Sequence, residues 1–296
     1  MKIATATYPV DWHADWTSYE AKITAWVVDA AAQGATLLVF AEYGAMELAS
    51  LAGAQVAGDI EASLRAVDAL RPKVDALYRR LAIGHQVHIL GASIPCFEGT
   101  RPTNRAMFYF PDGRVDFQDK QIMTMGERGA DICGQGPLKV FDTGIGRIGV
   151  IICYDSEFPD LSRALVEAGV EILLAPSCTE TLAGYWRVRI GSMARALESQ
   201  CVVVHSPLIG LAPWSGFVAQ NTGAAALYGP PDIGFPETGV LAEGVLNKPG
   251  WVIADVSLEA IRNVRANGVV RNKTHWPEQA QWAQEVTIAP LTSKTP

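Results

Sequence analysis

The chain has 296 residues, of which 49% are hydrophobic and 19% are charged, and this balance indicates a folded rather than a disordered protein. The net charge of −7 argues against a nucleic-acid groove, which would need a basic stripe, and no polybasic tract is present to bind an acidic membrane surface. We therefore expect neither nucleic acid nor a membrane among the partners.

The N-terminus and the cysteines indicate the compartment. The first eight residues alternate like a strand and lack the apolar stretch of a signal peptide, and polar residues interrupt the most apolar region, residues 25–46. The cysteines are odd in number and none form a C-x-x-C pair: Cys96, Cys133, Cys153, Cys178 and Cys201. We expect free thiols in a reducing, cytoplasmic protein, with neither a disulfide framework nor a zinc site.

Strand-like and helix-like segments alternate from the N-terminus onward. Over the first third of the chain we expect strands at 3–8 and 36–42 and helices at 15–33 and 59–82. Gly34 should end the first helix, and Pro72 marks a break or a new start in the second.

The rest of the chain continues this pattern. We expect strands at 88–93, 105–110, 115–120, 147–153, 171–176, 201–207 and 251–256, a hairpin turn at 111–113, and helices at 158–168 and 185–198. The Gly- and Pro-rich region 210–250 should hold short strands, and a short helix precedes a loose tail after about residue 272. Because no linker divides the chain, the sequence predicts one α/β domain over residues 1–296.

One cysteine occupies an unusual place. Cys153 ends the apolar run "GVIIC", and a helix starts soon after it, with a proline in its first turn. A cysteine between a strand end and a helix start lies where backbone N–H groups and the helix dipole favour a thiolate. The alternative is a buried core cysteine that simply continues the strand.

A nucleophilic cysteine needs a base and a group that stabilises the oxyanion. No histidine has the sequence context of a Cys–His protease, although His205 lies late in a strand. Two other predicted strands end on charges, Glu42 and Lys120, each of which could also simply emerge into solvent. Sites in open α/β sheets gather beyond the carboxyl ends of strands, so a carboxylate, an ammonium and a thiol at three such ends form a consistent set.

These three residues and their surroundings resemble the nitrilase superfamily of carbon–nitrogen hydrolases. Glu42 in "LLVFAEYG", Lys120 in "DFQDKQIM" and Cys153 in "GVIICYDSEFP" match the order, context and spacing of that superfamily's Glu–Lys–Cys triad. The segments "GVEILLAPSCTET", "MARALESQCVVVHS" and "GWVIADVSLE" also agree, so that the resemblance extends over residues 1–271. It implies a four-layer αββα sandwich and homodimers formed by packing of outer helices.

The resemblance also implies roles for the site residues. Glu42 would be the general base, Cys153 the nucleophile of a thioester mechanism, and Lys120 with the backbone N–H of Tyr154 the oxyanion donors. Glu127, seven positions after Lys120, corresponds to the second glutamate of the family and would position the substrate or share proton transfer; otherwise it is a solvated loop charge. No metal or organic cofactor is expected.

The substrate is predicted only as a class. Tyr154 and Asp155 after the cysteine resemble the amidase and carbamoylase branches, whereas Trp and Glu are more common in true nitrilases. Tyr154, Cys178 and Thr179 are predicted to bind the substrate, and Ser177 could line the same pocket. The aromatic residues Tyr185 and Trp186 could line it too or belong to the core. Nitriles, N-carbamoyl amides, a Cys–His or redox chemistry and a non-catalytic dimeric scaffold remain as alternatives.

Overall fold

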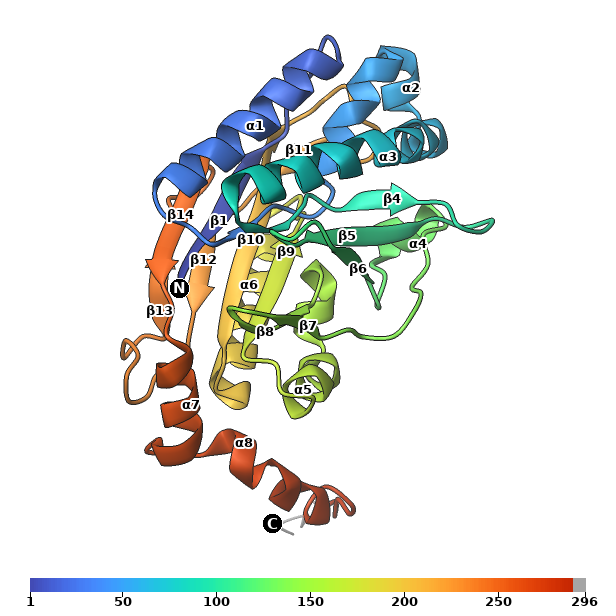
Figure 1. Ribbon diagram of the computed structural model, residues 1–296. Coiled ribbons are helices and arrows are strands. Elements are labelled where there is room, and N and C mark those ends of the chain that lie inside the picture. The colour runs from blue at the N-terminus through green and yellow to red at the C-terminus, as the bar shows by residue number, and fades with distance from the viewer. Residues whose placement is uncertain (290–296) are drawn as a thin grey trace.

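Two β-sheets lie face to face in the computed structural model, which describes residues 1–289, and helices cover the outer face of each sheet (Figure 1). The first sheet contains β1 (Lys2–Pro9), β2 (Leu37–Val39), β3 (His88–Leu90), β4 (Ile94–Cys96), β5 (Thr103–Tyr109), β6 (Val115–Asp119) and β14 (Gly250–Asp255). The second contains β7 (Phe141–Thr143), β8 (Gly146–Val150), β9 (Ile172–Ser177), β10 (Val202–Leu211), β12 (Ala226–Tyr228) and β13 (Val240–Glu243), and the short β11 (Gln220–Asn221) pairs with β10.

The sheets are joined where the end of β1 pairs in parallel with β10, at Tyr8 and Leu208. Helices α1 (Trp16–Ala32) and α3 (Ile60–His85) cover the first sheet, and α5 (Pro159–Glu167) and α6 (Leu182–Ser199) cover the second. The remaining helical segments are η1 (Gly44–Ala52), α2 (Ala54–Gly58), α4 (Met125–Gly129), η2 (Cys153–Glu157), α7 (Leu258–Asn267), α8 (Asn272–His275) and η3 (Trp276–Gln281).

Alternation along the strands explains the layers. In β1, Ile3 faces the apolar interior between the sheets, whereas the next residue, Ala4, packs among residues of α1 and α3. In β10, Val202 faces the same interior and Val203 packs toward α5 and α6. The predicted αββα sandwich is therefore confirmed.

Most predicted elements are present, but several differ in their bounds, and the strand predicted at 88–93 ends at Leu90. The strand predicted at 36–42 ends at Val39 and the one predicted at 147–153 ends at Val150, because the chain turns before reaching Glu42 and Cys153. Helix α3 also runs unbroken through Pro72. Pro72 lies on the exposed side of α3, where the carbonyl that its ring would meet can tilt toward solvent.

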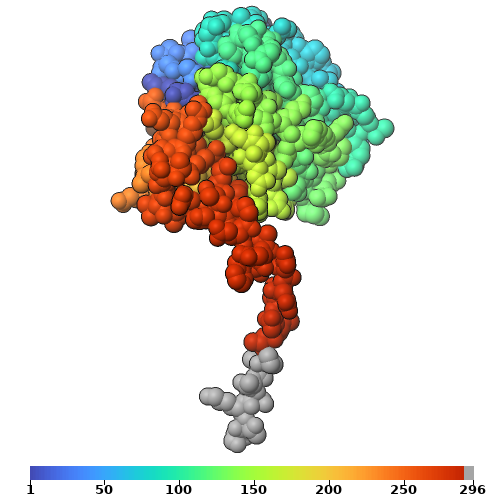
Figure 2. Space-filling model, turned by 60° about the horizontal axis from the view of Figure 1, so that its bottom comes forward, coloured from blue at the N-terminus to red at the C-terminus, as the bar shows by residue number. Residues whose placement is uncertain are grey.

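The first part of the predicted tail forms α8 and η3 and projects from the body of the molecule (Figure 2). Residues 290–296, which belong to the same predicted tail, lie outside the described residues. Within residues 1–289, no helix combines the length and the apolar character needed to cross a membrane. The single domain over residues 1–296 stays a prediction.

Candidate active site

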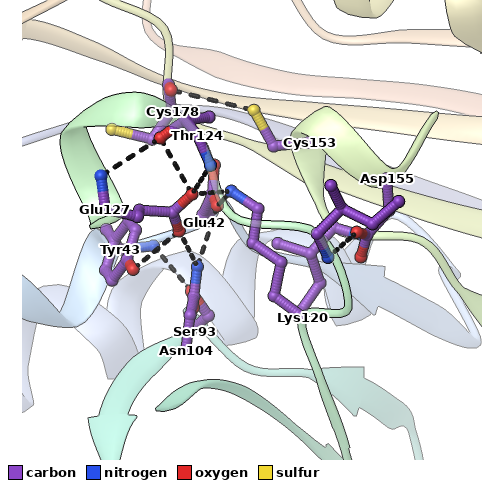
Figure 3. A network of polar contacts seen from close by, with 12 residues as sticks. Glu42, Tyr43, Ser93, Asn104, Lys120, Thr124, Glu127, Cys153, Asp155 and Cys178 are labelled. Carbon is purple, nitrogen blue, oxygen red and sulfur yellow. Dashed lines mark hydrogen bonds and ion pairs between the residues drawn. The ribbon is translucent and has the colours of Figure 1, made fainter. Parts of the chain in front are cut away.

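The four charged or nucleophilic residues singled out in the sequence converge at one end of the sandwich (Figure 3). Each is presented by a different element: Glu42 follows β2, Lys120 follows β6 directly, Glu127 lies in α4 and Cys153 is the first residue of η2. Three of the four therefore lie just past strand ends, as the sequence predicts.

The ammonium of Lys120 lies between the two carboxylates. Its Nζ is 2.8 Å from Glu42 Oε1 and 2.7 Å from Glu127 Oε2. Lys120 and Glu42 are each 1% exposed and Glu127 is 4% exposed, so that solvent hardly screens these ion pairs. This burial contradicts the alternative in which these charges emerge singly into solvent.

Glu127 is fixed by a helix cap. The side chain of Thr124 accepts from Glu127 N, and Glu127 Oε2 accepts from the Thr124 backbone N–H at 2.9 Å. Tyr43 OH donates to the other oxygen, Oε1, at 2.9 Å. The sequence signal for this cap is the Thr-x-x-Glu pattern of a capping box, whereas nothing in the sequence singles out Tyr43.

The backbone is strained on both sides of the site. Cys153 has φ 50° and Tyr43 has φ 53°, which is the left-handed region that residues with a Cβ rarely occupy. Ser156 Oγ donates to the Cys153 carbonyl at 2.6 Å, and Ser93 Oγ accepts from the Tyr43 N–H at 2.8 Å. These hydrogen bonds help to hold both residues in a conformation that sets the direction of their side chains.

Asp155 joins the cysteine loop to the lysine segment. Its carboxylate accepts from the N–H groups of Ile152 at 3.1 Å, Gln121 at 3.2 Å and Ile122 at 2.8 Å. The first of these precedes Cys153, and the other two follow Lys120. In the sequence, Asp155 served only to favour the amidase and carbamoylase branches, and this structural role was not predicted.

The Cys153 thiol is protonated in the resting site. Burial, and then the neighbouring Glu42, raise its pKa well above the usual value for cysteine. The prediction that a helix start favours the thiolate is therefore wrong, because burial in this site outweighs the short η2. The thiol donates to the Cys178 carbonyl at a sulfur–oxygen distance of 3.8 Å, and Glu42 lies close enough to influence its pKa.

The two glutamates differ in acidity. Burial raises the pKa of Glu42 to about 7, although Lys120 acts in the opposite direction. Burial also acts to raise the pKa of Glu127, but Lys120 and the hydrogen bonds from Thr124 and Tyr43 together outweigh it, and the net pKa is lowered. Although burial disfavours the ammonium, the charge of Glu42 and its neighbours keeps the pKa of Lys120 well above its usual value. Glu42 is thus the group poised to exchange a proton near neutral pH.

The predicted pocket residues are only partly placed at the site. Cys178 contacts the thiol through its carbonyl, and Tyr154, half-buried, packs against Phe158. The Thr179 hydroxyl donates to the Thr222 carbonyl at 2.8 Å and so fixes a loop.

The structure also places the three other side chains that the sequence suggests for the pocket. The Ser177 hydroxyl is hydrogen-bonded to His205 at 2.8 Å and Tyr185 packs in the interior against that ring, while Trp186 is 47% exposed on α6. Because His205 bonds to Ser177 rather than to Cys153, the geometry does not support Cys–His chemistry.

Comparison with known proteins defines the class. The model of the carbon–nitrogen hydrolase family matches residues 2–266. Among solved structures, Nit3 of Saccharomyces cerevisiae, described as a member of the nitrilase superfamily, superposes with a TM-score of 0.70 at 18% identity, covering 90% of this chain and 93% of that one. An amidase from Nesterenkonia sp. gives a TM-score of 0.67 at 22% identity, covering 90% and 94%.

The chain belongs to the carbon–nitrogen hydrolase family, as the sequence predicts, and it shares the fold of Nit3. Among curated relatives, the "probable hydrolase YhcX" of Bacillus subtilis is 36% identical over 197 residues, which are 66% of this chain and 38% of that protein. The human "deaminated glutathione amidase" is 33% identical over 46% of this chain and 42% of its own length. The match thus spans less than half of either relative.

Proposed function

We propose that the protein hydrolyses the carbon–nitrogen bond of a small amide through a thioester on Cys153. The observation that carries this proposal is the buried Lys120 ammonium held between two carboxylates beside a protonated thiol. A structural ion pair needs one carboxylate for one lysine and no thiol. A second carboxylate with a pKa near neutrality supplies what a cysteine nucleophile requires, a base.

Acylation starts with transfer of the thiol proton to Glu42. The sulfur then bonds to the amide carbon, and the carbonyl oxygen takes up the negative charge. Lys120 and the backbone N–H of Tyr154 stabilise this oxyanion. When the tetrahedral intermediate collapses, the C–N bond breaks and Glu42 returns the proton to the leaving nitrogen, which departs as ammonia or an amine.

Deacylation repeats the same proton transfers with water. Glu42 removes a proton from a water molecule, whose oxygen attacks the thioester carbon. The C–S bond breaks, the thiolate regains the proton, and the acid product leaves. Glu127, held by Thr124, Tyr43 and Lys120, orients the substrate and keeps the lysine in place rather than acting on the thiol.

Tyr154 and Asp155 favour amides over nitriles, by resemblance. Cys178 and Thr179 are proposed to line the acyl side of the pocket. An N-carbamoyl amino acid would need an arginine to bind its carboxylate, and the nearest downstream arginine, Arg163, points away to pair with Glu167 at 3.0 Å. Small amides without that carboxylate are therefore the first choice.

The test is ammonia release across aliphatic, aromatic, ω- and carbamoyl amides, their matched nitriles, and deaminated glutathione, for which several relatives are named. Wild type is compared with Cys153→Ala and with Cys201→Ala, a matched control because Cys201 is also fully buried but lies in a different layer of the core. We expect turnover of amides in wild type and in Cys201→Ala only. Turnover that survives in Cys153→Ala would refute the mechanism, and faster turnover of nitriles than of amides would move the protein to the nitrilase class.

We also propose that the protein is a cytoplasmic homodimer or larger homo-oligomer that needs no cofactor. An exposed apolar row on α6, called here the α6 ridge, supports the dimer: Leu182, Trp186 and Ile190 are 50%, 47% and 61% exposed. Their spacing of four residues puts them on one face of the helix. An exposed row of this kind on an outer helix fits packing against the same helix of a second copy.

A further inference from the structure

A buried asparagine bridges the two carboxylates of the site. Asn104 lies in β5 and is fully buried. Its Nδ2 donates to Glu42 Oε1 at 2.8 Å and approaches Glu127 Oε1 at 3.4 Å, as Figure 3 shows. The backbone carbonyl of Asn104 also accepts from the backbone N–H of Lys120 at 2.9 Å, because β5 pairs with β6. Asn104 therefore contacts all three charged residues.

The orientation of the Asn104 amide is fixed by Ser93. Ser93 Oγ accepts from the Tyr43 N–H at 2.8 Å, which leaves its own hydroxyl hydrogen free to donate. That hydrogen points to Asn104 Oδ1, 2.6 Å from the serine oxygen. Because Oδ1 is taken up in this way, the NH₂ group must face the carboxylates, and Asn104 can only donate to Glu42.

This donor divides the two oxygens of Glu42. Lys120 and Asn104 both bind Oε1, at 2.8 Å each. Oε2 accepts from neither of these two donors, and Glu42 lies close enough to Cys153 for each residue to affect the pKa of the other. The carboxylate is therefore held by two donors at one oxygen, and these contacts leave the other oxygen open to a proton from the nucleophile.

We propose that Asn104, oriented by Ser93, is a positioning residue that holds Glu42 ionised and turned toward Cys153. The inference deepens the proposed function, since it assumes that Glu42 is the base for the thiol. Asn104 makes no hydrogen bond to the thiol, and its shortest side-chain contact with a charged residue is the one to Glu42, through which it is proposed to act.

Removal of the Asn104 amide changes the acidity of Glu42 in a defined direction. The charged and titratable groups that face Glu42 come from four segments: Tyr43, Lys120, Glu127, Cys153 and Cys178. Of these, only Lys120 is a cation, and Asn104 adds a neutral donor to the same carboxylate oxygen at 2.8 Å. Loss of a hydrogen bond to the ionised form raises the pKa of Glu42, and its base form then appears at higher pH.

The experiment measures kcat/KM from about pH 6 to about pH 9 for wild type, Asn104→Ala and Ser93→Ala. A hydrogen bond to a charged group is typically equivalent to about one pKa unit or more. We therefore expect the acidic limb of the Asn104→Ala profile to move up by about one unit, with a loss about tenfold larger at about pH 6 than at about pH 9. Ser93→Ala, which releases the amide of Asn104 and also removes the acceptor of the Tyr43 N–H, should shift the limb in the same direction by less.

A control and a second readout make the test decisive. Thr103→Val, at the neighbouring buried position of β5, should leave the profile in place, because the Thr103 hydroxyl faces Asp119 rather than Glu42. The rate at which iodoacetamide alkylates Cys153 is measured over the same pH range, and this needs no amide substrate. If wild type hydrolysed no amide, the proposed function would fail while the alkylation profiles still tested Asn104. If kcat/KM and the alkylation rate fell by the same factor at every pH in both variants, the inference would be overturned. If Asn104→Ala does not fold, the pH profile of Ser93→Ala decides.

Discussion

Replacing Lys120 by methionine removes the charge at the centre of the site while keeping most of the side-chain volume. The variant leaves Glu42 and Glu127 buried without the ammonium that lies within 2.8 Å of both. Breaking a buried ion pair by removing one partner costs about 3–5 kcal/mol, because the remaining charge is left uncompensated. At roughly 2 °C per kcal/mol for a chain of this length, the unfolding midpoint should fall by about 6–10 °C at about pH 8.

The deficit should shrink as the pH is lowered. Without the cation, burial raises the pKa of both carboxyl groups in the folded variant above the unfolded value of about 4.3. A folded-state pKa that is raised contributes stability that is fully present below the unfolded pKa and is lost as the pH rises through the folded pKa. Since Glu42 already has a pKa of about 7 with Lys120 in place, the loss should extend from about pH 5 to beyond pH 7.

Lys139→Met is the matched control. Lys139 Nζ pairs with Asp116 at the same 2.7 Å found between Lys120 and Glu127, but its side chain is 28% and that of Asp116 47% exposed. A solvent-exposed pair contributes about 0–1 kcal/mol, so this variant should unfold within about 2 °C of wild type. The assay is thermal unfolding by circular dichroism between about pH 5 and about pH 8, alongside amide turnover.

The reasoning fails if Lys120→Met is no less stable than Lys139→Met at about pH 8, or if its deficit does not depend on pH. Turnover is a separate readout. Loss of one oxyanion donor typically lowers the rate by about 10²–10³. Lys120→Arg should not restore it, because a planar fork cannot take the place of a compact ammonium between two carboxylates.

Four further predictions concern the chemistry and the assembly. Glu127→Gln should leave Cys153 reactive toward iodoacetamide while amide turnover falls sharply, whereas Glu42→Gln should suppress both; wild-type turnover in Glu127→Gln would return that residue to a structural role. In wild type, kcat/KM should rise with pH through about 7, where Glu42 loses its proton, and a flat profile across this range would argue against Glu42 as the base. Iodoacetamide should modify Cys153 before Cys201, whose pKa burial raises to about 12 and which has no base beside it, as peptide mapping would reveal. Sedimentation should give a mass well above the 31.8 kDa of one chain, and Ile190→Asp on the α6 ridge should lower it; an active wild-type monomer would contradict the dimer.

Sequence patterns were sufficient for most strands and helices and for the charged residues, whereas the four layers were predicted only from the family resemblance. Apolar runs mark the strands, and a charge or thiol at the end of such a run is visible without knowing the sheet order. Glu42, Lys120 and Cys153 could therefore be selected before their contacts were known. Their exact distance past the strand ends could not be predicted, because the apolar runs continue beyond Val39 and Val150, where the strands end.

The neutral residues of the site escaped prediction for a different reason. Asn104 reads as an ordinary strand residue, and it reaches Glu42 only because β5 pairs with β6 in a register that puts it beside Lys120. Tyr43 meets Glu127 across 84 positions of sequence. Contacts of this kind depend on register and strand order, which local patterns do not encode. The acidity of Cys153 was mispredicted because a helix start is visible in sequence but the burial around it is not.

The site also explains why two glutamates accompany one lysine. Lys120 has a raised pKa and Glu127 a lowered one, so these two form a pair that stays charged across the neutral range. Such a pair has no net charge and leaves Glu42 as a single buried carboxylate beside a protonated thiol. Burial alone would push the pKa of Glu42 higher still, and the shared ammonium brings it back to about 7. With one glutamate, the lysine would pair with the base itself and hold it ionised at a lower pKa, where it would be a weaker acceptor for the thiol proton. In the proposed mechanism the second glutamate therefore divides the lysine's charge, and this division keeps Glu42 basic enough to deprotonate Cys153.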